Sequence, residues 1–421
     1  MTPEVKERVK QIRRGEVPEG YKKTKAGIVP RDWRAGKEYK ARDVFKSITN
    51  KKHNGEFEVL SATQDKGVIP RSQVDIDIKF DESSVTGYKK VDRGDFVISL
   101  RSFQGGIEYS EYEGVVSPAY TVLKPIVPIC NGYYKAYFKT ADYISRLNKA
   151  TYGIRDGKQI GFEDFGDMQL HYPPLAEQEK IAQILTVQDK VIELKEKLLA
   201  EKQRQKKCLM QQLLTGKKRL PGFAGEWHTM SLSKISKKVT EKNTGFKYVV
   251  VFSNSAQNGI IPQNEQFDKD IANDDNIDKY YIVPRGCFVY NPRISVTAPC
   301  GPINVNHNSI TGVMSPLYTV FSVESGNIDN DYLEQYFKST IWFKYMKSVA
   351  NYGARHDRMS ITDEDFFNMP IKIGDIKEQH AIKKVLLTAD SEIELIQKAL
   401  DQEKQKKKAL MQLLLTGIVR V

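Results

Sequence analysis

The side chains best suited to chemistry in this sequence are basic and amide residues beside short loops. Arg101 follows a strand-like run and Gln104 lies three residues later, while Asn291 and Arg293 follow a similar run further along the chain. Arginine binds phosphate oxygens and base edges, and asparagine and glutamine bind base edges. Gln104 and Asn291 are therefore candidates for base reading. Arg101 and Arg293 are candidates for a phosphate contact or, equally, for a structural ion pair.

Two further loops combine a turn with basic side chains. Tyr152-Gly-Ile-Arg155 and Tyr352-Gly-Ala-Arg355 have the same form, and Lys158 and Arg358 come three residues after the arginines. Exposed basic loops beside rigid turns suit the clamping of phosphates. The full set of candidates for DNA contact is Arg101, Gln104, Tyr152, Arg155, Lys158, Asn291, Arg293, Tyr352, Arg355 and Arg358.

The sequence motifs typical of catalysis and metal binding are missing. The chain has no G-x-x-x-x-G-K-[ST] loop and no G-x-G-x-x-G motif after a strand. The six histidines form no i,i+4 pair, and the four cysteines include no C-x-x-C pair. We therefore predict no catalytic residue and no metal site, which favours a binding or scaffolding protein.

The composition favours a polyanionic partner. The 421 residues contain 65 Lys and Arg against 53 Asp and Glu, a net charge of +12, with a pI near 9.2. The length suggests two to four domains at roughly 100–200 residues each. No apolar run approaches the ~18 residues that span a bilayer, and the charged N-terminus does not resemble a secretory signal. We expect a cytoplasmic protein with no membrane partner, and the scattered cysteines fit a reducing compartment.

The chain contains an internal repeat of about 200 residues. Leu185–Gly216 and Leu386–Gly417 align with a shift of 201 and are identical at 16 of 32 positions. Earlier segments also match, such as Gly114–Val122 with Gly312–Val320, at shifts that drift from 192 to 200. A period this long is typical of two copies of one large unit and not of a solenoid.

Each copy consists of a compact part followed by a long helix. Residues 25–173 and 219–372 carry strand-like runs such as Phe96–Leu100, Tyr120–Leu123 and Tyr248–Phe252. Each compact part also has one predicted helix. It lies at Gly132–Lys149 in the first copy, with Asn131 as its possible N-cap, and at Asp331–Val349 in the second. This pattern predicts an α+β domain in each copy.

Two uninterrupted helices are predicted over 175–214 and 376–415, because apolar residues recur there at spacings of three, four and seven. A helix of 40 residues is ~60 Å long. Each helix can pack on its own domain, or the two can pair as an antiparallel coiled coil. We favour the coiled coil, because a small domain offers no face of that length. Gln188 and Lys202 lie near the predicted seam, where polar residues can fix the register. The segment Val9–Gly15 also matches the helix end Met210–Gly216, which predicts a short helical lead-in.

These features closely resemble the specificity (S) subunit of type I restriction–modification systems. The resemblance rests on the order domain–helix–domain–helix, on the helix beginnings Pro174–Leu185 and Ile376–Ile382, and on the shared helix ending Leu-Met-Gln-x-Leu-Leu-Thr-Gly. The opening segment Tyr21–Trp33 also belongs to it. One departure is Gly374-Asp375, which stands where the family has a proline.

The resemblance implies a fold class of α+β, with two similar target recognition domains separated by two long antiparallel helices in a coiled coil and related by a pseudo-two-fold repeat. It implies a target recognition domain over 1–174 (with a lead-in over 1–16), a helix over 175–216, a second recognition domain over 217–373 and a helix over 374–421. The resemblance also implies a non-enzymatic subunit that reads a bipartite, asymmetric double-stranded DNA site, with one half-site for each domain.

The same resemblance implies the partners and cofactors. Two DNA methyltransferase (M) subunits would dock on the helices, and restriction/translocase (R) subunits would join through the complex. S-adenosylmethionine, ATP and magnesium would belong to those partners, and this chain would hold none. Two other functions remain open: a coiled-coil structural organiser that binds proteins without reading DNA, and a self-contained methyltransferase. The missing nucleotide-binding glycines argue against the methyltransferase.

Overall fold

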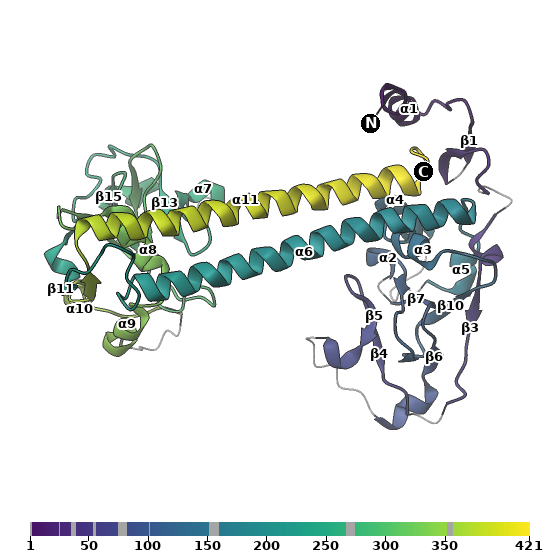
Figure 1. Cartoon of the computed structure of the whole chain (residues 1–421), viewed down its shortest axis with the longest axis horizontal. Coiled ribbons are helices and arrows are strands. Elements are labelled where there is room, and N and C mark those ends of the chain that lie inside the picture. Colours follow the sequence, from purple (N-terminus) through teal and green to yellow (C-terminus); the bar gives the residue numbers. More distant parts are fainter. Residues whose placement is uncertain are drawn as a thin grey trace. The chain divides into compact units, whose positions relative to one another are not determined.

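The computed structural model describes residues 2–24, 26–34, 39–53, 56–74, 82–100, 102–150, 160–266, 274–324, 326–351 and 357–421. Its contacts divide the chain into two units (Figure 1). Unit 1 is Met1–Glu196 with Ala399–Val421, and unit 2 is Lys197–Lys398. Because this division falls inside both long helices, it does not test the four predicted domain boundaries, which stay a prediction.

Unit 1 contains a four-stranded antiparallel sheet in the order β3 (Phe45–Ile48), β10 (Thr121–Pro125), β7 (Phe96–Ile98), β8 (Glu108–Tyr109). Three strand pairs accompany it: β1 (Tyr21–Thr24) with β2 (Gly27–Pro30), β4 (Leu60–Thr63) with β5 (Gly67–Pro70), and β6 (Lys89–Val91) with β9 (Gly114–Val116). The helices of the unit's globular part are α1 (Pro3–Arg13), α2 (Ser102–Gly105), α3 (Asn131–Tyr137), α4 (Ala141–Ala150) and α5 (Phe162–Gly166).

Unit 2 repeats the four-stranded sheet of unit 1 and two of its strand pairs. Its sheet has the order β12 (Ser236–Lys238), β19 (Thr319–Val323), β16 (Phe288–Tyr290), β17 (Ile303–Val305). Its strand pairs are β11 (His228–Ser231) with β20 (Pro370–Ile373), β13 (Phe252–Ser255) with β14 (Gly259–Pro262), and β15 (Tyr281–Val283) with β18 (Gly312–Met314). Its short helices are α7 (Gln263–Gln266), α8 (Asn330–Lys338), α9 (Phe343–Val349) and α10 (Asp363–Phe367). The four-stranded sheet and two strand pairs thus recur in the same order, whereas β1–β2 in unit 1 is a local hairpin and β11–β20 in unit 2 pairs strands from the two ends of the domain.

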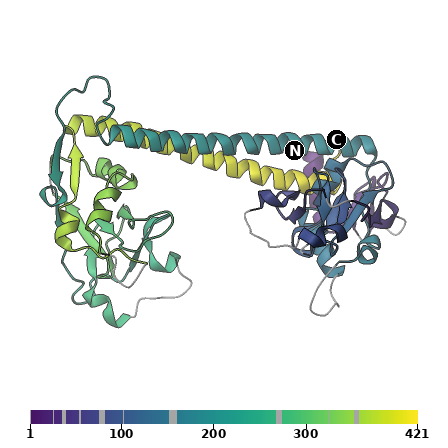
Figure 2. The ribbon, with the colours of Figure 1, turned by 90° about the horizontal axis from the view of Figure 1, so that it is seen from below.

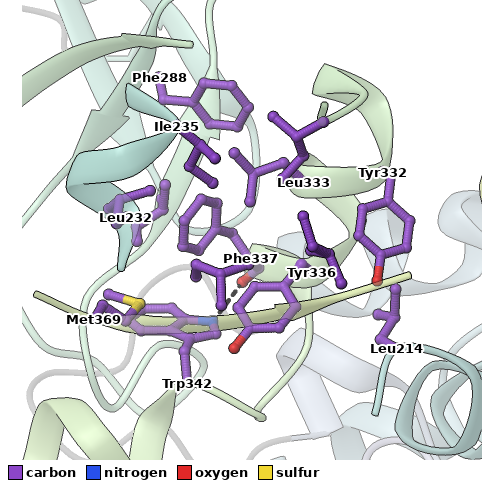
Figure 3. Close-up of a cluster of buried hydrophobic side chains, with 14 of the residues drawn as sticks. Leu214, Leu232, Ile235, Phe288, Tyr332, Leu333, Tyr336, Phe337, Trp342 and Met369 are labelled. Carbon is purple, nitrogen blue, oxygen red and sulfur yellow. Dashed lines mark hydrogen bonds between the residues drawn. The ribbon is translucent and has the colours of Figure 1, made fainter. Parts of the chain in front are cut away.

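Aromatic side chains fill both cores. In unit 2, Phe288 of β16 stacks on Phe321 of β19 with ring centroids 5.2 Å apart, and Phe337 of α8 meets both rings edge-on. Figure 3 shows this cluster, in which the indole N–H of Trp342 donates to the carbonyl of Phe337 at 2.9 Å. Burying one such side chain stabilises the fold by about 1.5–3 kcal/mol. This packing holds the sheet against α8 and fixes the loops at the strand ends.

Two details of the predicted secondary structure are wrong. The single helix predicted at Gly132–Lys149 is two helices, α3 and α4, because the side chain of Thr140 accepts the N–H of Tyr143 and starts a new helix. The matching helix predicted at Asp331–Val349 is likewise two helices, α8 and α9. Asn131 is the first residue of α3, and the cap is Cys130, which makes no side-chain cap bond.

The strand predicted at Tyr248–Phe252 is also misplaced. β13 begins only at Phe252, and Val251 makes an isolated bridge to Val313. Val249, in the middle of the predicted strand, is 74% exposed. The β-branched run is therefore an approach to the hairpin and not a buried strand.

The long helices are α6 (Leu175–Leu213) and α11 (Ile376–Leu415), close to the predicted ranges. Within each unit a stretch of α6 runs antiparallel to a stretch of α11 (Figures 1 and 2). In unit 1, the Gln188 amide donates to a carboxylate oxygen of Glu403 at 2.8 Å, and Lys404 pairs with Glu196 at 2.7 Å. In unit 2, Lys202 pairs with Glu392 at 2.7 Å. The predicted coiled-coil pairing is confirmed, and Gln188 is the buried seam residue that the sequence predicts.

The ends of the long helices also pack on the domains. Packing of a helix on its own domain, the other arrangement that the sequence left open, therefore also occurs. In unit 1, Ile181 and Leu185 of α6 and Leu414 and Leu415 of α11 belong to the aromatic core of the unit. The part of the chain that the structure describes contains no helix long and apolar enough to cross a membrane. Each helix therefore has two parts: an end that completes a domain core and a middle that pairs with the other helix.

The repeated dipeptide Glu177-Gln178 and Glu378-Gln379 explains how a domain is attached to its helix. The side-chain Oε1 of Gln178 accepts the N–H of Cys130, and the side-chain Oε1 of Gln379 accepts the N–H of Asp329, both at 3.0 Å. Both glutamine side chains are fully buried. In both copies the glutamine therefore ties the start of a long helix to the segment before α3 or α8.

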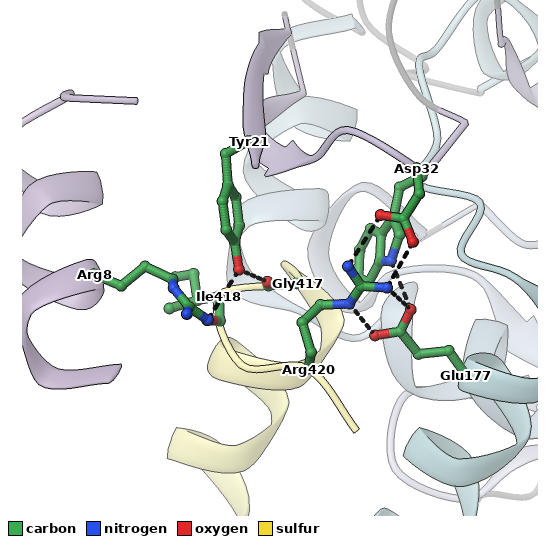
Figure 4. A network of polar contacts seen from close by, with 8 residues as sticks. Arg8, Tyr21, Asp32, Glu177, Gly417, Ile418 and Arg420 are labelled. Atoms are coloured by element: carbon green, nitrogen blue, oxygen red, sulfur yellow. Dashed lines mark hydrogen bonds and ion pairs between the residues drawn. The ribbon is translucent and has the colours of Figure 1, made fainter. Parts of the chain in front are cut away.

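The glutamates of the dipeptide bind an arginine that follows the end of the other helix. Glu177 accepts the Trp33 indole N–H at 2.9 Å and the Arg420 Nε–H at 2.6 Å, and Arg420 also donates to both oxygens of Asp32 (Figure 4). These bonds to Arg420 lower the pKa of Asp32. In unit 2, Glu378 accepts from Trp227 at 2.8 Å and from Arg219.

The departure from the family at Gly374-Asp375 leaves the helix start capped. The Asp375 carboxylate accepts the N–H of Glu378 at 2.9 Å, as an N-cap residue does. The helical lead-in is present as α1, and Gly15 after it has a φ of +80°, as Gly216 and Gly417 after the long helices have φ of +69° and +73°.

Candidate nucleic-acid interface

A hollow of about 440 Å³ with both apolar and polar walls opens in unit 2, between hairpin β13–β14 and the loop after β16. Its walls combine amide, hydroxyl, basic and aromatic side chains. They are Val251, Ser253, Asn254, Ser255, Ala256, Gln263, Tyr280, Asn291, Arg293, Ile294, Ser295, Pro302, Ser315, Leu317 and Tyr318. We call this hollow the unit 2 groove. Its lining has the donors and acceptors that bind base edges.

Three asparagines shape the groove by bonding to one another and to the backbone. Asn254, which is 3% exposed, donates to the carbonyl of Val289 at 2.7 Å and accepts from the Asn304 amide at 2.6 Å. Asn291 donates to the carbonyl of Asn254 at 2.9 Å, and its own oxygen accepts the N–H of Arg293 at 3.0 Å. Asn291, predicted to read bases, therefore has its amide engaged within the protein. The network instead fixes the backbone that carries Arg293.

Arg293 and Arg358 are brought together although they are 65 residues apart in the chain. They form an antiparallel bridge, and both guanidinium groups lie near Asp357, with Nε to Oδ2 distances of 3.9 Å and 3.8 Å. These ion pairs are long, and the Arg293 side chain is 67% exposed. Exposed pairs of this kind add little stability. Arg293 therefore presents its charge at the edge of the groove.

The groove also holds polar groups that the protein itself does not use. The carboxamide of Gln263, the first residue of α7, makes no hydrogen bond within the described ranges. The hydroxyls of Tyr280 and Tyr318 make none there either. Groups in a preformed hollow that lack internal partners are suited to bind a ligand.

The globular part of unit 1 has the same hairpin register at the matching positions but different side chains. The hairpin registers are alike: Leu60 pairs with Pro70, and Phe252 pairs with Pro262. When the residues of the two units are matched from these pairs, unit 1 has side chains of a different kind at the positions that line the unit 2 groove. Ala62 corresponds to Asn254, Arg71 to Gln263, and Ser99 to Asn291. The polar side chains of the groove thus differ between the copies.

Four of the ten predicted contact residues lie within the described ranges. Asn291 and Arg293 line the groove, Arg358 lies beside Arg293, and Gln104 is exposed on α2 in unit 1. The other six lie outside the described residues: Arg101, Tyr152, Arg155, Lys158, Tyr352 and Arg355. DNA contact by any of the ten stays a prediction.

Sequence reasoning missed Gln263, Asn254 and Tyr280. Gln263 directly follows the Pro that ends a hairpin, as Arg71 does in unit 1, and this was the available signal. Asn254 had none, because its role depends on contacts with residues 35 to 50 positions away. Among the described residues, no group of three His, Cys, Asp or Glu side chains could hold a metal ion.

Comparisons with known proteins find similarity to type I specificity subunits. The domain model "Type I restriction modification DNA specificity domain" matches residues 34–203. A protein of Methanocaldococcus jannaschii named as the MjaX specificity subunit of a type I restriction enzyme is 24% identical over 461 residues, covering 96% of this chain and 97% of its own. This chain is similar to type I specificity subunits over nearly its whole length.

Solved structures of specificity subunits share the fold. The HsdS subunit from Thermoanaerobacter tengcongensis has a TM-score of 0.51 at 15% identity, with 93% of this chain and 98% of that chain covered. A chain from a structure of the type I R-M system, solved to explain complex assembly and conformational transition, has a TM-score of 0.58 at 14% identity, with 93% and 99% covered. Specificity subunits are non-catalytic parts of restriction–modification complexes.

Proposed function

We propose that this specificity subunit reads a bipartite, asymmetric double-stranded DNA site, one half-site for each recognition domain. The observation that carries the proposal is that two domains with the same four-stranded sheet and hairpin register differ at matching polar positions, such as Arg71 and Gln263. A common backbone with different hydrogen-bonding side chains is what reading two unequal half-sites requires. The net charge of +12 supplies the sequence-independent attraction to phosphates.

The long helices are the proposed docking surface for two copies of a DNA methyltransferase subunit. Leu194 in unit 1 and Leu395 in unit 2 occupy equivalent positions, 201 residues apart, and are 54% and 66% exposed. Exposed leucines on a paired helix are suited to bury against a further helix. Because the same position is exposed in each unit, the surface fits two copies of one partner. Restriction subunits would join through the complex.

The expected division of labour places the cofactors on the partners. S-adenosylmethionine would bind the methyltransferase subunits, and ATP and magnesium the restriction subunits. This chain would contribute the choice of sequence. Its location would be the cytoplasm, where the partner subunits meet DNA.

Methylome sequencing tests the proposal directly. A host that carries this subunit with its methyltransferase should show methylated adenines in one bipartite motif, and a host that lacks the subunit should not. Exchange of residues 219–372 for the matching domain of another specificity subunit should change one half of the motif and leave the other unchanged. A motif in which both halves change would contradict reading by separate domains. If the purified chain shows no salt-dependent retention on duplex DNA, a coiled-coil structural organiser would be favoured instead.

A further inference from the structure

The residue after each hairpin has the same backbone setting in both units. The N–H of Arg71 donates to the carbonyl of Val59 at 2.9 Å, and the N–H of Gln263 donates to the carbonyl of Val251 at 2.8 Å. Each residue begins a short helical turn directly after a proline. The backbone thus delivers either side chain from the same place in the domain.

Gln263 has the chemistry of an adenine-reading residue. Its side chain lines the unit 2 groove, and within the described part of the chain its carboxamide donates and accepts no hydrogen bond. A glutamine carboxamide pairs with the N6 donor and N7 acceptor of adenine in the major groove. The groove around it is fixed by the buried Asn254 network, so the amide is presented from a rigid surface.

Arg71 has the chemistry of a guanine-reading residue. Its Nε donates to the Ser61 hydroxyl at 3.3 Å, and Ser61 is 8% exposed on β4. This bond directs the plane of the guanidinium, and a directed guanidinium binds the O6 and N7 of guanine in a bidentate manner. Unit 2 keeps the serine, as Ser253, but replaces the arginine with Gln263. At this position the supporting serine is therefore shared by the units, and the side chain after the proline differs.

We propose that this position, Arg71 in unit 1 and Gln263 in unit 2, determines one base pair in each half-site. Arg71 reads the guanine of a G·C pair in the first half-site, and Gln263 reads the adenine of an A·T pair in the second. This inference rests on the proposed function, because it assigns a base to a residue within the half-site that each domain reads.

Reciprocal substitution tests the assignment. With Gln263→Arg, one A·T pair in the second half of the methylated motif should become G·C, and the first half should stay the same. With Arg71→Gln, one G·C pair in the first half should become A·T. With Gln263→Ala, discrimination at that one pair should fall about tenfold, because one bidentate contact is lost. Melting temperatures and methyltransferase binding, measured in parallel, show that each variant is folded and assembled.

A matched control separates base reading from added charge. Gln257→Arg places the same new charge at the exposed turn of the same hairpin, outside the groove lining. It should raise affinity for all sequences alike and leave the motif unchanged. An unchanged motif in folded, assembled Gln263→Arg would overturn the inference while the bipartite function stands. A wild-type subunit that directs no bipartite motif at all would instead overturn the proposed function.

Discussion

The guanidinium of Arg219 donates two hydrogen bonds to Glu378, at 2.6 Å from Nε and 2.7 Å from a terminal nitrogen, and the Glu378 side chain has no exposed surface. The glutamate starts α11 and the arginine follows the end of α6, so the pair joins two helix ends within unit 2. Arg420 and Glu177 form the same pair in unit 1.

Removing the charge of Glu378 should destabilise unit 2. Glu378→Gln removes the charge of a fully buried carboxylate that accepts from both Arg219 and Trp227, so the free energy of unfolding should fall. Urea unfolding followed by tryptophan fluorescence measures this loss through Trp227, which also donates to Glu378. Glu394→Gln on the same helix is the control, because its pair with Lys398 is 66% exposed on both sides and should contribute less than about 0.5 kcal/mol. Equal effects of the two substitutions would contradict a structural role for Glu378.

The stability of unit 1 should fall as the pH falls from about 6.5 towards 4. Burial, with the nearby charge of Arg146, lowers the pKa of His171 to about 4, against the opposing effect of the carbonyls of Leu415 and Ala26. The unfolded chain takes up a proton near pH 6.5 and the folded chain does not, so the free energy of unfolding decreases by about 1.4 kcal/mol per pH unit in this window.

Replacing the histidine tests that assignment. His171→Asn should flatten the pH dependence of unfolding between pH 6.5 and 4, measured in denaturant titrations at several pH values. His228→Asn, at an exposed position in unit 2, should keep the wild-type slope. A slope that persists in His171→Asn would assign the pH dependence to other groups.

Gly417 should tolerate alanine less well than Gly15, although both end a helix with positive φ. The left-handed backbone costs a side chain about 1–2 kcal/mol at either position. A Cβ at Gly417 would also lie 2.5 Å from the Pro30 ring and 3.0 Å from the Trp33 ring, whereas nothing lies within 4 Å at Gly15. Thermal unfolding should therefore show a lower Tm for Gly417→Ala than for Gly15→Ala. Equal losses would mean that Pro30 and Trp33 move aside freely.

Arg293→Ala should weaken DNA binding and reduce the dependence of affinity on salt by about one ion, because one phosphate contact is lost. Fluorescence anisotropy with a duplex that carries the methylated motif, repeated at several salt concentrations, gives both quantities. Lys372→Ala, which removes an exposed charge on β20 outside the groove, should change neither by a comparable amount. An unchanged slope in Arg293→Ala would remove this residue from the DNA contact.

The sequence predicted the long helices well because their signal is local and repeated. Apolar spacing in Leu185–Gly216 and its copy is visible in a window of a few turns, and no Gly or Pro interrupts it. The break between α3 and α4 escaped prediction because Thr140 starts a helix by a single side-chain bond. Asn291 was chosen for its type, but its amide is engaged by Asn254, 37 residues earlier in the chain. Such partners follow from the folded sheet and not from sequence spacing.

The seam between the helices has diverged since the duplication. Unit 1 has the bonded pair Gln188 and Glu403, while the equivalent residues in unit 2 are Ala389 and Lys202, and Lys202 pairs elsewhere, with Glu392. Two methyltransferase subunits docked as proposed would therefore bind beside helix seams that differ in hydrogen bonds and charge. The affinities of the two binding sites should therefore differ. When the methyltransferase is scarce, a complex with one methyltransferase subunit bound at the tighter site should accumulate.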